Sequence, residues 1–195
     1  MTVWVPPLVA VHQIRTAVLG ELQVWLPTAL AEVAAETGVD VPPSPRSWHR
    51  LGTWDQVAEA QLPVVFVAVP ATSGTTVRRA EAYDAVWDLQ VVAAVRGGSY
   101  EQTAEAVSVY AAAIRAVLTQ RPVGWTCRWT GEMYDAMPAR GQRTLAATMV
   151  TWTVEVADAI GLESPMRHAS GPPDGPPTVP TVQETDVEVV VDESP

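Results

Sequence analysis

A long strand that runs directly into a capped helix is the feature of this 195-residue sequence that most constrains its fold. Between residues 83 and 95, apolar side chains such as Trp87 alternate with others that include Asp88. A period of two over this length predicts a strand with one buried face. The glycine pair at 97–98 then ends the strand and allows the chain to turn.

The segment from residue 99 to residue 118 carries the signals of a helix start and of an amphipathic helix. Ser99 and Gln102 have the spacing of a capping box, and Glu101 suits the positive end of the helix dipole. An apolar stripe at three- and four-residue intervals predicts one buried face, made by Ala104, Val107, Ala111, Ile114 and Leu118.

The remaining segments predict one more helix and several strands. Residues 8–36 carry a helical stripe, although Pro27 predicts a kink or a break near Trp25. Alternation or continuous apolar runs predict strands at 63–70, 125–133 and 143–158, with Met133 on the same face as Trp125, Cys127 and Trp129.

This order predicts an α+β domain over residues 1–163, in which an antiparallel or mixed β-sheet packs against the N-terminal helix and the second, amphipathic helix. Residues 164–195 form a different region, a proline-rich acidic tail with six acidic residues and one arginine. Within it, Val187, Val189 and Val191 occupy alternate positions of residues 185–192. This alternation of apolar side chains predicts a strand that can pair with the edge of a sheet.

The sequence offers little that points to catalysis. It contains no Walker loop, GxGxxG, HExxH or GxSxG motif. The histidines His12, His49 and His168 are too scattered to predict a metal site, and Cys127 lies on the apolar face of its strand, where a thiol is inert. We therefore expect no cofactor, no metal and no enzymatic activity.

The charge pattern bears on partners. The formal net charge is −10 and every basic residue other than histidine is an arginine. Such an acidic chain is a poor candidate for binding DNA through contacts to the DNA phosphates. We expect a solvent-facing or lumen-facing acidic surface to include Asp84, Asp88 and Glu132.

A separate candidate interface lies at the turn-rich loop of residues 71–77 and at the tail. It comprises Thr75, Thr76, Arg78, Arg79, Val187, Val189 and Val191.

The segment YDAVWDLQVVAAVRGGSYEQTAEAVSVYAAAIRAVL, from Tyr83 to Leu118, resembles the corresponding part of the tail terminator proteins of long-tailed bacteriophages. The likeness in element order extends over about residues 8–160, whereas Pro27 and the proline-rich tail depart from it. It rests on the order of elements, so no functional residue is carried over from the family.

This resemblance implies a structural virion protein at the tail–head junction, made in the host cytoplasm. It implies a hexameric ring that caps the tail tube, ends its polymerisation and joins it to the head connector. The implied partners are other copies of the chain, the major tail tube protein and the head-side connector or stopper protein. DNA would pass without specific binding, and no apolar run has the ~18–20 residues of a membrane span.

Three alternatives remain open from the sequence, one of them an adaptor whose acidic tail, residues 164–195, recruits a basic partner. The chain can be another neck component, such as a head-closure or tail-completion protein. It can also belong to a different class, a cytosolic enzyme or small-molecule binding domain with a carboxylate site built from Asp84, Asp88, Glu132 and Arg128.

Overall fold

The computed structural model describes residues 11–50, 59–72, 77–79, 82–120, 125–137 and 144–161. In chain order these form α1 (Val11–Thr37), β1 (Ser47–His49), the 3-10 turn η2 (Glu59–Gln61), β2 (Val64–Thr72), β3 (Val77–Arg79), β4 (Ala82–Gly97), α2 (Tyr100–Gln120), β5 (Thr126–Met137) and β6 (Thr144–Gly161). The predicted strand at 185–192 lies outside the described residues.

The strands form one mixed sheet in the order β1-β2-β4-β6-β5, with β3 paired to β4 beyond the end of β2. The β1–β2 pair is parallel and the other pairs are antiparallel. Strands β4 and β6, 16 and 18 residues long, make the centre of the sheet. The predicted α+β class, with a mixed sheet packed against two helices, is therefore confirmed.

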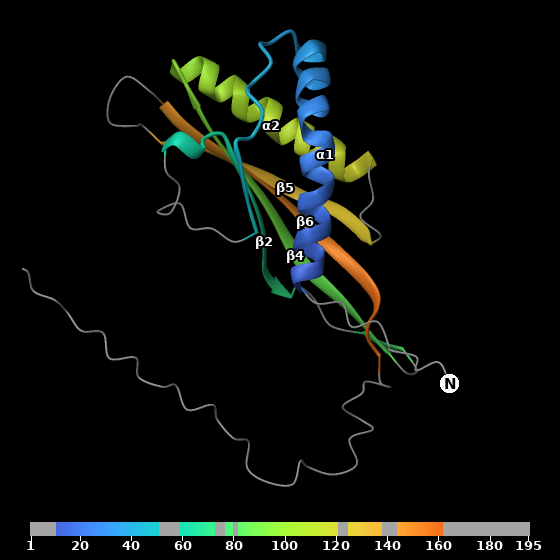
Figure 1. The fold of residues 1–195 in the computed structure, drawn as a ribbon. Coiled ribbons are helices and arrows are strands. Elements are labelled where there is room, and N and C mark those ends of the chain that lie inside the picture. Colours follow the sequence, from blue (N-terminus) through green and yellow to red (C-terminus); the bar gives the residue numbers. More distant parts are fainter. Residues whose placement is uncertain are drawn as a thin grey trace, which may run out of the picture.

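Both helices lie on the same side of the sheet (Figure 1). Helix α2 packs on β4, β6 and β5, and α1 packs on α2 and β2. One hydrophobic core joins α1 and α2 to alternate residues of the sheet, including Leu89, Val91 and Trp152. The alternation predicted for residues 83–95 thus gives β4 its buried face.

The start of α2 follows its predicted cap. The Ser99 hydroxyl accepts a hydrogen bond from the Gln102 backbone N–H at 3.2 Å, the capping-box geometry. The Thr103 N–H and side-chain hydroxyl both donate to the Ser99 carbonyl, at 3.1 Å and 2.5 Å. These bonds fix the turn that carries the chain from β4 back over the sheet.

Helix α1 continues through Pro27, so of the kink or break expected near Trp25 the break does not occur. The missing proline N–H removes one helical hydrogen bond. Leu22, Leu26 and Leu30 are all buried on either side of the proline, and this burial offsets the loss. Pro27 itself is exposed.

Candidate functional site

The sheet has two unlike faces. One carries Leu89 and Val91 of β4 and packs against α1 and α2. The other, here called the open face, carries Asp88, Gln90 and Val92 of β4, and neither α1 nor α2 packs on it. Its β2 end is buried, in a small cluster of Val64, Phe66 and Ala94 with Leu62 packed against it. Its β5 end is covered by no helix or strand among the described residues, so that end is the natural candidate for contact with a partner.

One row of apolar residues crosses the open face from strand to strand. Phe66 of β2 pairs with Val92 of β4, Val92 pairs with Met149 of β6, and Met149 pairs with Met133 of β5. We call these four residues the apolar row. Exposure is low at one end, 6% for Phe66, and high at the other, 58% for Met133. The row therefore runs outward to the β5 edge of the sheet.

A groove of about 170 Å³ follows the outer half of the apolar row. It is lined by Val92, Met133, Asp135, Leu145, Ala147 and Met149. Most of these side chains are apolar, and Asp135 supplies the ionisable group at its margin. Its volume lies below the roughly 300–1,000 Å³ of typical small-molecule pockets, so the groove suits an apolar side chain of a protein partner better than a small-molecule ligand.

Polar residues occupy the open face beyond the apolar row. Asp88 pairs with Thr153, and Thr153 pairs with Arg128, so that Asp88 and Arg128 stand two strands apart, about 10 Å. The Arg128 guanidinium forms an ion pair with Glu155 at 3.3 Å. Since the side chain of Arg128 is 69% exposed and that of Glu155 41%, this pair contributes little to stability.

A β-bulge in β5 changes which residues reach this face. Trp129 pairs with Trp152 and Gly131 pairs with Thr151, so Thr130 is an extra residue between them. An extra residue exchanges the two faces for everything that follows it. Met133 therefore lies on the open face, and the prediction that it shares the face of Cys127 is wrong.

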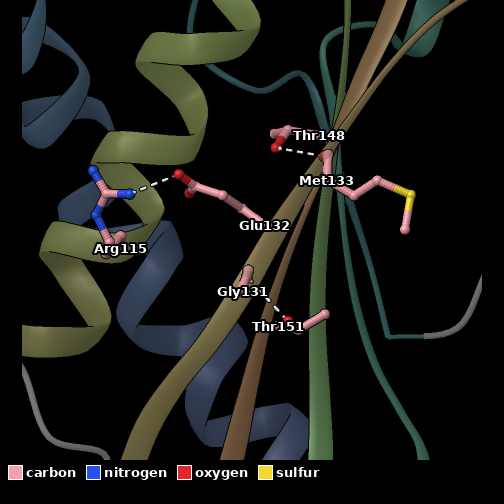
Figure 2. A network of polar contacts seen from close by, with 6 residues as sticks. All are labelled: Arg115, Gly131, Glu132, Met133, Thr148 and Thr151. Atoms are coloured by element: carbon pink, nitrogen blue, oxygen red, sulfur yellow. Dashed lines mark hydrogen bonds and ion pairs between the residues drawn. The ribbon is translucent and has the colours of Figure 1, made fainter.

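The same bulge turns Glu132 toward α2. The Glu132 carboxylate forms an ion pair with the Arg115 guanidinium, in which Arg115 Nη1 donates a hydrogen bond to Glu132 Oε1 at 2.8 Å (Figure 2). Glu132 thus lies on the opposite face of the sheet from Asp88. Below it, the Thr151 hydroxyl donates to the Gly131 carbonyl at 3.0 Å and secures the bulge.

Two exposed aromatic residues flank the Arg115–Glu132 pair. The Arg115 guanidinium lies 5.3 Å from the centre of the Trp129 ring, a cation–π contact. Trp129 is 48% exposed and Tyr134 51%. Partial burial, together with the charge of Glu132 and a hydrogen bond to it, raises the pKa of Tyr134, whereas Arg115 acts in the opposite direction.

The residues of the hypothetical carboxylate site do not gather. Asp84 and Asp88 lie on β4 and face the open side with Arg128 of β5, while Glu132 faces the helices. Within the described part of the chain, no group of three His, Cys, Asp or Glu side chains is placed to hold a metal ion. Cys127 is half-buried, and burial raises the pKa of its thiol, as expected of an unreactive cysteine.

The other predicted interface residues are placed only in part. Arg78 and Arg79 belong to β3, whose backbone pairs with the start of β4. Thr75 and Thr76, and the tail valines Val187, Val189 and Val191, lie outside the described residues. The surface found on the open face was not predicted from the sequence, because the four members of the apolar row come from four strands that are distant along the chain.

The described helices include none that is long and apolar enough to cross a membrane. No family model matches the chain, and no curated protein matches it. Among solved structures, the chain is similar to one from the virion of a native gene transfer agent particle, at a TM-score of 0.32 and 14% identity, covering 73% of this chain and 95% of that one. A TM-score this low carries no argument about fold or function.

Proposed function

We propose that this chain is a structural virion protein that assembles with copies of itself into a ring. The ring, a hexamer, caps a phage tail tube, ends its polymerisation and joins the tail to the head-side connector. The observation that carries the proposal is the apolar row on the open face, which ends at the 58% exposed Met133 on a sheet edge. A surface of this kind is typical of a protein that is completed by neighbours.

Two further features support this assignment. The element order is the one for which the sequence resembles tail terminators: a long helix, a strand pair, a long strand, a helix and two more long strands. The net charge of −10 suits a ring through which DNA passes without adhering, because like charges repel the phosphates. Asp84 and Asp88 are candidates for the lumen on this basis.

The direct test is deletion of the gene in the phage or phage-like particle that encodes it, with tail lengths measured by electron microscopy. A terminator predicts tails much longer than in the wild type, and restoration of normal length when the gene is supplied in trans. Normal tails on heads that leak DNA would assign the chain to head closure instead. A purified chain that stays monomeric and never appears at a tube end would contradict the proposal.

A further inference from the structure

The outer edge of β5 has two features that proteins usually cover: free backbone hydrogen-bonding groups and a largely exposed apolar side chain. Within the described residues β5 pairs with β6 alone, so its second edge presents backbone N–H and C=O groups over much of a 12-residue strand. At the same edge Met133 ends the apolar row with more than half of its surface exposed. The next position of that row would fall on a strand added beyond β5.

We propose that residues 185–192 of this chain are that strand, adding to the β5 edge next to residues 131–135. Strand addition supplies affinity through backbone hydrogen bonds and specificity through alternate side chains. Here the alternate valines would extend the apolar row past Met133 and close the groove of about 170 Å³. The inference does not rest on the proposed function, since the contact can form within one chain as well as between copies.

The segment has the composition that this position requires. Val187, Val189 and Val191 alternate with Glu188 and Val190, so one face of the strand is entirely β-branched and apolar. Valine at the position opposite Met133 would pack on its thioether and on the groove. The flanking carboxylates, Asp186 and Asp192, bracket the apolar stretch at both ends.

The connecting chain is long enough to reach the edge. Strand β6 ends at Gly161. In an antiparallel arrangement with Val189 opposite Met133, Thr185 stands opposite Met137, which pairs with Leu145, 16 residues or about 53 Å back along β6. Residues 162–184 provide 23 residues, which span about 26 Å as a coil and about 70 Å as polyproline II. The proline-rich stretch favours the longer range, so the distance is within reach.

The strand direction follows from the charges near Met133. With Val189 opposite Met133, a parallel strand would place Glu188 opposite Glu132, a like-charge pair. An antiparallel strand instead places Glu188 opposite Tyr134 and Val190 opposite Glu132. Val187 and Val191 then stand on the open face beside Asp135 and Gly131. The antiparallel arrangement is therefore the one proposed.

Cysteine cross-linking in the full-length chain tests the contact. In a Cys127→Ala background, Met133→Cys is combined with Val189→Cys and oxidised, and the products are separated on a non-reducing gel and mapped by mass spectrometry. Directly opposed positions in a sheet approach disulfide distance. We expect this pair to cross-link about tenfold faster than two controls, because docking raises the local thiol concentration. The first control pairs Met133→Cys with Val190→Cys, and the second pairs Arg128→Cys with Val189→Cys.

Both products of the main pair support the proposal. A monomer of altered mobility shows docking within one chain, and covalent dimers or ladders show docking on a neighbouring copy. Cross-linking at 133 and 189 that is no faster than in the controls would overturn it, whatever the outcome of the tail-length experiment.

Hydrogen exchange provides a second measurement that needs no cysteine. The triple variant Val187→Asp, Val189→Asp, Val191→Asp is compared with the wild-type full-length chain. We expect the amides of residues 131–135 to exchange about tenfold faster in the variant, while those of α2 stay unchanged. Equal exchange in β5 for the two proteins would also overturn the proposal.

Discussion

Gly97 is the residue where the turn from β4 into α2 leaves no space for a side chain. A Cβ at this position would meet the Thr103 side chain and lie 3.1 Å from the Thr103 backbone N and 3.2 Å from its Cα. Thr103 is fully buried and is held by two hydrogen bonds to the Ser99 carbonyl, so it cannot give way. We expect Gly97→Ala to destabilise the protein by about 1–3 kcal/mol, measured by urea unfolding.

The neighbouring glycine is the matched control. A Cβ at Gly98 would meet only the Gln102 side-chain oxygen, at 3.1 Å, and this is the far end of an exposed, flexible side chain. Gly98→Ala should therefore change stability by less than about 0.5 kcal/mol. Equal losses in the two variants would show that backbone conformation, and not the contact with Thr103, sets the requirement for glycine.

Tyr110 ties α2 to the segment that follows α1. Its ring is fully buried and its hydroxyl donates to the Pro43 carbonyl at 2.5 Å. Burial raises the pKa of this hydroxyl well above its usual value near 10. We expect Tyr110→Phe to cost about 1–2 kcal/mol at pH 7, because the Pro43 carbonyl loses its donor.

The raised pKa of Tyr110 also makes stability depend on pH in the alkaline range. Above about pH 10 an unfolded tyrosine ionises while folded Tyr110 keeps its proton, so stability falls as pH rises further. Unfolding free energies measured from pH 8 to pH 11 should fall less steeply for Tyr110→Phe than for the wild type. Tyr100→Phe, at a side chain that is 67% exposed, is the matched tyrosine control.

At the scale of elements, α1 retains a proline in its interior at a measurable cost. Proline in a helix interior is about 3 kcal/mol less favourable than alanine, and its stiffening of the unfolded chain returns about 1 kcal/mol. Because Pro27 is exposed, replacing it removes little packing. We expect Pro27→Ala to stabilise the protein by about 1–3 kcal/mol in urea unfolding.

The exposed Gln23, one turn earlier in α1, is the control for that substitution. Gln23→Ala restores no backbone hydrogen bond and should change stability by less than about 0.5 kcal/mol. A Pro27→Ala variant less stable than the wild type would show that the proline ring itself makes contacts that matter to the fold.

Local signals predicted the elements well, and non-local pairing explains what they missed. The cap at Ser99, the extent of α2 and the alternation of β4 are properties of neighbouring residues, and the structure has all of them. The β5 bulge was not predicted, because an extra residue at Thr130 leaves an alternation that still reads as continuous. Of the kink or break expected near Trp25, the break does not occur, because tertiary burial outweighs the local penalty of Pro27.

The candidate site depends on the strand order and on the register of β5, which no local sequence pattern predicts. Asp84 and Asp88 were correctly expected to share a strand face, because they lie on one strand. The apolar row needs the order of four strands and the phase of β5 after its bulge, and neither is written in any one segment. Glu132 was grouped with the two aspartates for the same reason, and the bulge places it beside Arg115 instead.

For the whole molecule, the net charge of −10 opposes the association of identical copies, whereas an apolar row favours it. Added salt screens the repulsion and leaves burial of apolar surface intact, since the Debye length falls from about 30 Å at 0.01 M to about 8 Å at 0.15 M. We therefore expect the assembled fraction, measured by sedimentation velocity, to rise between 0.01 and 0.3 M NaCl.

Met133→Glu should remove assembly at every salt concentration if the apolar row lies in the contact, whereas Val24→Glu, at an α1 side chain that is 65% exposed, should leave it in place. An assembled fraction that falls with salt would mean instead that opposite charges hold the copies together.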